Sequence, residues 1–401
     1  MTTAIIISIC VLLLIAYLFD LSSSKTRIPP VILLLLLGWV VRQSVRLLAI
    51  EVPDPGSFLP ALGTIGLILI VLEGSLELEL NRSKIPMIGK SLFVALIPII
   101  GLAFFLAFLF NYYDGISYKA GLINAIPFCV ISSAIAIPSV KNLSRNQREF
   151  VTYESSLSDI LGILFFNFLA YNTIINSASF AQFGLQLIII TAISFIATVG
   201  LALLLSKIDH HIKFAPIVLL VILIYEISKV YNLPGLIFIL LFGLFLGNLD
   251  ELKRFKWIQK LKPDELNGEV FKFKELIIEG TFLIRSLFFL LFGYLIETAE
   301  IINSQTLVWA MVIAVAIIVI RAIVLKVVRL PLTPLLFIAP RGLITILLFL
   351  GISTEQSIAL VNRSLIIQVI IITALIMMLG LMFTKKSKDE DPIEETIFPH
   401  H

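Results

Sequence analysis

Long apolar segments recur along the whole chain and are separated by short polar connections. A helix needs about 20 apolar residues to cross the hydrocarbon core of a membrane, so the pattern predicts thirteen spans. We expect them near residues 4–19, 29–50, 58–78, 89–111, 118–140, 149–172, 183–206, 214–231, 234–248, 272–297, 306–329, 333–353 and 363–384. The predicted fold is an all-α polytopic membrane protein, with one transmembrane domain over 1–384 and a short charged tail at 385–401.

Composition and charge agree with this assignment. Of the 401 residues, 59% are hydrophobic and 14% are charged, whereas soluble domains are about 25% charged. Basic residues gather in the odd-numbered connections, while most of the even-numbered ones, such as "EVPDPGS" and "TAEIINSQT", are neutral or acidic. Because basic loops stay cytoplasmic, we expect the N-terminus outside the cell and the C-terminus inside.

Several ionisable residues fall inside the predicted spans. Such residues are costly at membrane depth and usually functional. They are Glu73, Glu154, Asp159, Arg285, Arg321 and Arg341. A structural role, in which an acid and a base hold two helices together, is the alternative for any one pair.

The sixth predicted span begins with the unusually polar stretch "YESSLSDILGILFF". Ser155 and Asp159 are four residues apart on one helix face, and Glu154 and Ser158 share the neighbouring face. Asp159 has hydroxyl groups nearby but no basic residue at helical spacing. Loss of water disfavours a bare carboxylate, so this group should take up either a proton or a small cation. That choice is the chemistry of an antiporter, although serine hydroxyls also bond helix carbonyls.

The fifth and twelfth predicted spans are interrupted. "AIPFCVISSAIAIPSV" has two prolines around Ser132 and Ser133, and "LTPLLFIAPRGLITI" has two prolines and a glycine around Arg341. Simple proline kinks are one interpretation. If spans 1–6 and 8–13 form two repeats, however, both interruptions fall at the fifth position. Unwound helices at corresponding positions of two inverted repeats are typical of a transporter binding site.

"YESSLSDILGILFF" resembles the sixth helix of the monovalent cation/proton antiporters, in the sodium/proton exchanger branch that includes NhaP-like and NHE-like proteins. Four other segments are similar to helices of the same family, in the same order. They are "LILIVLEGSLELEL", "GLIFILLFGLFLGN", "RSLFFLLFGYLIE" and "APRGLITI". The resemblance therefore covers nearly the whole chain.

The resemblance implies a role for each candidate residue. Asp159 matches the aspartate that binds a cation, Na⁺ or K⁺, and a proton in turn, and Ser158 stands where electroneutral relatives have Asn and electrogenic ones Asp. Further cation ligands would be Ser155 and Glu73, with Ser132 and Ser133 in the unwound helix. Glu154 and Arg341 would form a buried ion pair, and Arg321 would support the crossed-helix core. Because Ser132–Ser133 replaces the "TDP" of many relatives and is closer to a potassium-type "SST", K⁺ stays an alternative to Na⁺.

The resemblance also implies how the protein works. It predicts an electroneutral antiporter of the plasma (inner) membrane, surrounded by lipid, that acts as a homodimer by alternating access. The scaffold would comprise spans near 1–80 and 214–297, and the core spans near 89–172 and 306–384. We expect a monovalent cation as substrate, Na⁺ in first place with Li⁺ or K⁺ as alternatives, and no cofactor and no nucleic-acid partner. A K⁺/H⁺ antiporter, a channel-like protein or a non-transporting sensor are the alternatives.

An enzyme is disfavoured by the residues themselves. The histidines away from the C-terminus are His210 and His211, both in a predicted loop. Asp159 has no partner aspartate in the membrane, and there is no zinc motif. The sequence therefore offers no recognisable catalytic group for intramembrane hydrolysis.

Overall fold

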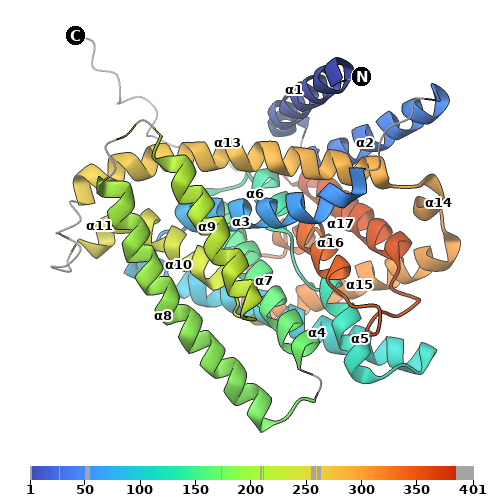
Figure 1. Ribbon diagram of the computed structural model, residues 1–401. Coiled ribbons are helices and arrows are strands. Elements are labelled where there is room, and N and C mark those ends of the chain that lie inside the picture. Colours follow the sequence, from blue (N-terminus) through green and yellow to red (C-terminus); the bar gives the residue numbers. More distant parts are fainter. Residues whose placement is uncertain are drawn as a thin grey trace.

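The computed structural model describes residues 2–26, 28–49, 55–172, 174–207, 210, 212–253, 259 and 263–384. The predicted tail at 385–401 and His211 lie outside the described residues. Over the described ranges every regular element is helical, and the long helices form a bundle (Figure 1). The predicted all-α class is confirmed.

The long helices follow the predicted order along the chain. They are α1 (Thr2–Thr26), α2 (Pro30–Leu47), α3 (Leu59–Glu77), α4 (Ile85–Asp114), α7 (Arg145–Tyr171), α8 (Ser177–Lys207), α9 (Phe214–Val230), α10 (Leu236–Gly247), α13 (Pro263–Leu295), α15 (Ser304–Val327) and α17 (Arg363–Phe383). Shorter helices are α5 (Tyr118–Ala125), α6 (Ser133–Ser139), α11 (Leu249–Leu252), α14 (Thr298–Ile301) and α16 (Leu343–Leu350). Single 3-10 turns are η1 (Pro55–Phe58), η2 (Arg82–Lys84), η3 (Ile126–Phe128) and η4 (Leu335–Phe337).

Within the described residues, nine helical segments are long and apolar enough to cross a membrane. The other four predicted spans coincide with α7, α9, α10 and α16, which are more polar, shorter or interrupted. One boundary differs clearly: α13 begins at Pro263, ahead of the predicted 272. Its first turns carry charged side chains, and hydropathy detects only the apolar part of a helix that continues into water. The chain is an integral, multi-pass membrane protein.

Both predicted interruptions are present. The chain leaves helical geometry between η3 and α6, and again between η4 and α16. The N–H of Ser132 donates to the carbonyl of Pro340 at 2.9 Å, so the two interruptions lie side by side. A Cβ added at Gly342 would lie 2.8 Å from Ser132 Oγ and 3.1 Å from Ser132 Cβ, so glycine favours this close approach. Prolines in both segments remove backbone donors and favour the breaks.

The helices pack in two groups. In one, α2 and α3 pack against α13, and α3 also packs against α10; in the other, α4 packs against α7 and α15, and α15 packs against α17. Small residues allow close approach in the first group: a Cβ on Gly38 would lie 2.2 Å from the carbonyl oxygen of Leu290. Close backbone contact at small residues is a common way to join helices in lipid.

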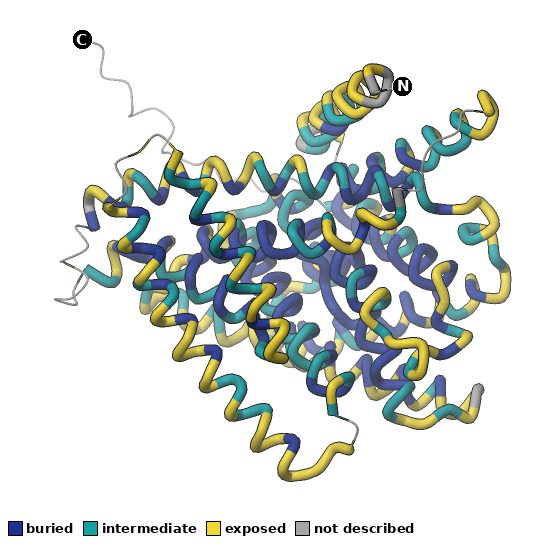
Figure 2. The backbone as a smooth tube through the Cα atoms, in the orientation of Figure 1, coloured by how far each residue is buried: buried dark blue, intermediate teal, exposed yellow. Residues whose placement is uncertain are grey.

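The outer surface of the bundle is apolar. The long helix α8 exposes many apolar side chains, Ile188, Phe195 and Ile196 among them. In Figure 2, α8 is exposed along much of its length while the centre of the bundle is buried. Exposed apolar side chains on a helix of this length fit contact with lipid.

Candidate functional site

Asp159 lies at the centre of the bundle, where α7 passes the first interruption. Its side chain is 1% exposed. Oδ2 accepts a hydrogen bond from the hydroxyl of Ser133, the first residue of α6. Among the described residues, Oδ1 has no hydrogen-bond partner. Asp159 therefore has one engaged oxygen, one oxygen able to accept a proton or a cation, and no basic partner in the described part of the chain.

The other predicted hydroxyls lie in different settings. Ser132 Oγ is buried and, within the described ranges, has no hydrogen-bond partner. Ser158 Oγ accepts from the N–H of Ile131 at 3.0 Å and so holds the non-helical segment against α7. Ser155 Oγ donates to the carbonyl of Val151 at 2.8 Å, the backbone bond that serines in helices commonly make. Each hydroxyl keeps lone pairs that could face a cation.

Glu154 is paired with Arg321, and the predicted pair with Arg341 is wrong. Arg321 donates from both terminal nitrogens to the two oxygens of Glu154, and the Nη2–Oε2 distance is 2.9 Å. Its Nε also donates to the carbonyl of Leu335 at 2.7 Å. Arg321 thus joins α7, α15 and η4, and the acid that sequence reasoning assigned to Arg341 is occupied.

Arg341 instead binds backbone carbonyls freed by the interruptions. Its Nε donates to Phe128 at 2.6 Å, Nη1 to Ala339 at 2.7 Å, and Nη2 to Cys129 at 3.4 Å. Carbonyls at a helix end lack partners within their helix, and a guanidinium offers five donors in a planar fork. The unpaired carbonyls explain why the donors of Arg341 are engaged here and not at Glu154. Nothing in the sequence distinguishes the two arginines as partners of Glu154, since both lie in predicted core spans.

The ends of the two helical pieces carry complementary charges. Asp159 contacts the N-terminus of α6 through Ser133, and Arg341 binds the carbonyls of Phe128 and Cys129 at the end of η3. Negative groups are favoured at helix N-termini and positive groups at C-termini. The interruption is therefore stabilised by one acid and one base that serve different ends, without forming an ion pair with each other.

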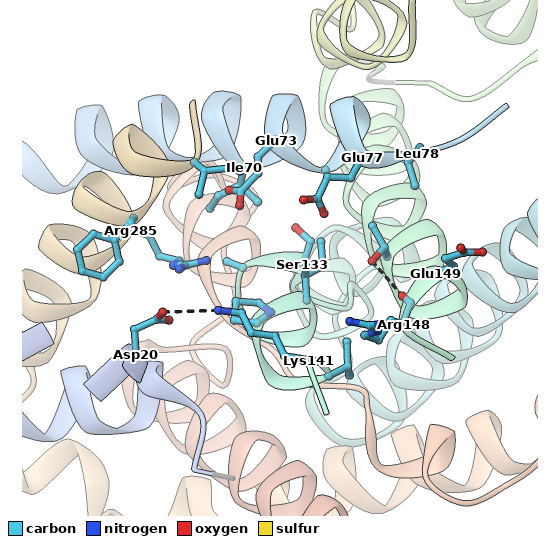
Figure 3. A pocket seen from close by; sticks show the side chains of 18 of the residues that line it. Asp20, Ile70, Glu73, Glu77, Leu78, Ser133, Lys141, Arg148, Glu149 and Arg285 are labelled. Atoms are coloured by element: carbon cyan, nitrogen blue, oxygen red, sulfur yellow. Dashed lines mark hydrogen bonds and ion pairs between the residues drawn. The ribbon is translucent and has the colours of Figure 1, made fainter. Parts of the chain in front are cut away.

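A cavity of about 810 Å³, called the vestibule below, leads to this region (Figure 3). It is lined by parts of α1, α3, α6, α7 and α13, and it reaches Ser133, whose hydroxyl bonds Asp159. Glu73 lines the α3 wall. Lys141 and Arg145, from a connection predicted to be cytoplasmic, also line it. The vestibule thus extends from the connection that carries Lys141 to the hydroxyl beside Asp159.

The two walls approach closely next to Glu73. A Cβ added at Gly74 in α3 would lie 2.9 Å from Ser156 Oγ in α7. The turn of α3 that carries Glu73 is therefore packed on the turn of α7 that precedes Asp159. Glu73 and Asp159 come from separate helix groups, so a movement of one group relative to the other would change the distance between the two carboxylates.

Many apolar helices, a buried carboxylate beside two interrupted helices and a cavity that reaches its serine partner are typical of a membrane transporter of small ions. The family model "Sodium/hydrogen exchanger, transmembrane" matches residues 10–385, and the chain belongs to this family. The predicted family is confirmed, and it is a family of exchangers and not of enzymes.

Two solved structures show the same fold. The sodium proton antiporter MjNhaP1 from Methanocaldococcus jannaschii at pH 8 is 18% identical, with a TM-score of 0.67 over 94% of this chain and 99% of that one. A second structure of MjNhaP1, from an electron-microscopy map, is 19% identical, with a TM-score of 0.65 over 95% of each chain. No curated protein sequence matches the chain.

Proposed function

We propose that the protein exchanges a monovalent cation for a proton, with Asp159 as the group that binds each in turn. The observation that carries the proposal is the state of this carboxylate: it is buried, one oxygen accepts from Ser133, and the other has no partner among the described residues. A desolvated carboxylate requires a proton or a cation to balance its charge. Membership of the sodium/hydrogen exchanger family favours Na⁺, and Li⁺ is a close alternative.

The oxygens available to a cation come from both interrupted and intact helices. Ser132, Ser133, Ser155 and Ser158 supply hydroxyl oxygens near Asp159 on the core side, and Glu73 supplies a carboxylate across the vestibule. Because Ser132 has no partner in the described residues, it is the hydroxyl most free to turn toward a cation. A site made mainly of hydroxyls is also compatible with K⁺, which makes a K⁺/H⁺ antiporter the second candidate.

The proposed movement follows from the two helix groups. Thirteen spans would form two inverted repeats, with the discontinuous helices crossing at Ser132 and Pro340. The scaffold would hold spans near 1–80 and 214–297, and the core those near 89–172 and 306–384. In alternating access the core would carry Asp159 past Glu73 while the scaffold stays still. We further propose a homodimer in the plasma (inner) membrane, with the N-terminus outside.

Exchange should be electroneutral. Glu154 is occupied by Arg321, and the family position that is Asp in electrogenic members is Ser158 here. Among the buried carboxylates of the described core helices, Asp159 is then the one free to exchange, and it carries one proton or one monovalent cation. Glu73 stays with the scaffold and attracts the cation without travelling with it.

Purified protein in proteoliposomes with a trapped pH dye tests this proposal. Gradients of Na⁺, Li⁺, K⁺ and Rb⁺ are applied in turn, and at least one should drive proton flux. A potential of about 100 mV, worth about 2.3 kcal/mol per net charge moved, is then imposed without a gradient of the transported cation. It should drive no flux. Flux driven by potential alone would refute the stoichiometry, and no flux with any cation would favour a sensor.

A further inference from the structure

The charges around the vestibule are mostly matched in pairs. Four of its acids contact bases within 4 Å: Asp20 with Lys141 at 3.5 Å, Glu77 with Lys274 at 3.5 Å, Glu79 with Arg145 at 3.6 Å, and Glu149 with Lys84 and Arg145. Four charged lining residues have no ion pair of this kind among the described residues: Glu279 and Arg148 at the rim, and Glu73 and Arg285 further in. The inner part of the vestibule therefore holds one fixed acid and one fixed base.

Arg285 faces Glu73 across this inner part. Arg285 lies on α13 and Glu73 on α3, and both side chains line the vestibule. In Figure 3 the guanidinium of Arg285 is directed into the cavity, with Glu73 on one side and Asp20 on the other.

A fixed positive charge beside a cation pathway needs an explanation. Repulsion by Arg285 weakens the binding of every cation, so the residue does not serve affinity. Its effect depends on valence, because the repulsion felt by a divalent cation is twice that felt by a monovalent one at the same position. Without Arg285, the ionised forms of Asp159 and Glu73 would together present two negative charges, a donor set that suits Ca²⁺ or Mg²⁺.

We propose that Arg285 is a specificity-determining residue whose charge cancels that of Glu73, so that the site carries one net negative charge and discriminates against divalent cations. The inference rests on the proposed exchange at Asp159. Arg285 acts on the bound ion only through its charge and its position on the scaffold. Because α3 and α13 belong to one packed group, the cancellation persists while the core moves.

Variants of Arg285 distinguish its proposed electrostatic effect on the bound cation from a purely structural role in α13. Na⁺-driven proton flux is measured in proteoliposomes at alkaline pH, where carboxylates are ionised, with Ca²⁺ or Mg²⁺ added as competitor. In R285Q, the divalent concentration giving half inhibition should fall about tenfold or more, as expected for removal of a unit charge within several ångströms. R285K keeps the charge and should stay within about threefold of the parent protein. Unchanged divalent inhibition in folded R285Q would overturn the proposal.

A second pair of variants covers the case in which R285Q does not fold. E73Q leaves Arg285 uncompensated, so the Na⁺ concentration for half-maximal flux should rise about tenfold. Adding R285Q to E73Q removes both charges and should recover much of that loss. A double variant no better than E73Q would contradict the charge assignment.

Binding supplies a readout that does not depend on transport. Ca²⁺ should raise the melting temperature of R285Q in detergent, but should raise that of R285K and of the parent much less. If the parent protein shows no cation-driven flux, the proposed exchange fails, and this measurement still decides the charge assignment. Equal Ca²⁺ stabilisation of all three proteins would reject it.

Discussion

Glu154 of α7 and Arg321 of α15 form a two-pronged ion pair that is closed to solvent, with exposures of 1% and 2%. Fork-to-fork pairs of this kind fix geometry as well as charge. The pair ties together two helices of the proposed core, and it removes Glu154 from the set of carboxylates able to exchange ions. Asp159 is left as the buried acid of α7 that has no ion pair within the described residues.

Breaking this pair from one side should be costly. We expect Arg321→Ala to lower the stability by about 3–5 kcal/mol, because Glu154 would keep a buried charge without a partner. The double change Glu154→Gln with Arg321→Gln should lower the stability by less than the sum of the two single changes. Thermal unfolding in detergent measures the cycle. Strictly additive effects would show that the two residues are not coupled.

Arg341 should be needed for its shape as well as its charge. Loss of its side chain leaves the carbonyls of Phe128 and Ala339 without this donor, at about 1–3 kcal/mol each. A lysine cannot reproduce the planar fork, so Arg341→Lys should recover less than half of the melting-temperature loss of Arg341→Ala. Full recovery by lysine would mean that charge alone matters. Coupling of Arg341 to Glu154 should be clearly weaker than that of Arg321.

Gly74 should be sensitive to a single methyl group. A Cβ there would lie 2.9 Å from Ser156 Oγ, between the proposed scaffold and core. We expect Gly74→Ala to slow cation-driven proton flux several-fold, and Ser156→Ala in the same protein to restore part of it. Gly280→Ala, whose Cβ would meet Leu69 at an ordinary 3.8 Å, is the matched control. Equal flux in the two glycine variants would exclude a steric effect at this contact.

The sequence predicted those features that depend on local pattern. The apolar segments, both interruptions and the polar face of α7 with Asp159 can each be read from spacing and composition. The partner of Glu154 could not be read in this way. Arg321 and Arg341 lie on different predicted spans, and which of them reaches α7 depends on helix rotation and depth, which no pattern within one helix records.

The lining of the vestibule is a second feature that the sequence could not predict. Glu73 and Arg285 are each visible in the sequence as ionisable residues inside apolar spans, but their placement in the wall of one cavity depends on how α3 packs against α13. The hydroxyls likewise differ in use: Ser155 bonds its own helix, whereas Ser133 bonds Asp159. Residue type predicted all of these candidates, and packing decides what each one contacts.

The account depends most directly on Asp159, and one variant tests it. Asp159→Asn removes the exchangeable charge while keeping the size of the side chain and its ability to bond Ser133. Proton flux driven by a cation gradient is measured for the purified variant and the parent in proteoliposomes, with melting temperatures as the check on folding. We predict a folded variant without cation-dependent flux. Flux at the parent rate in a folded Asp159→Asn protein would contradict the central claim.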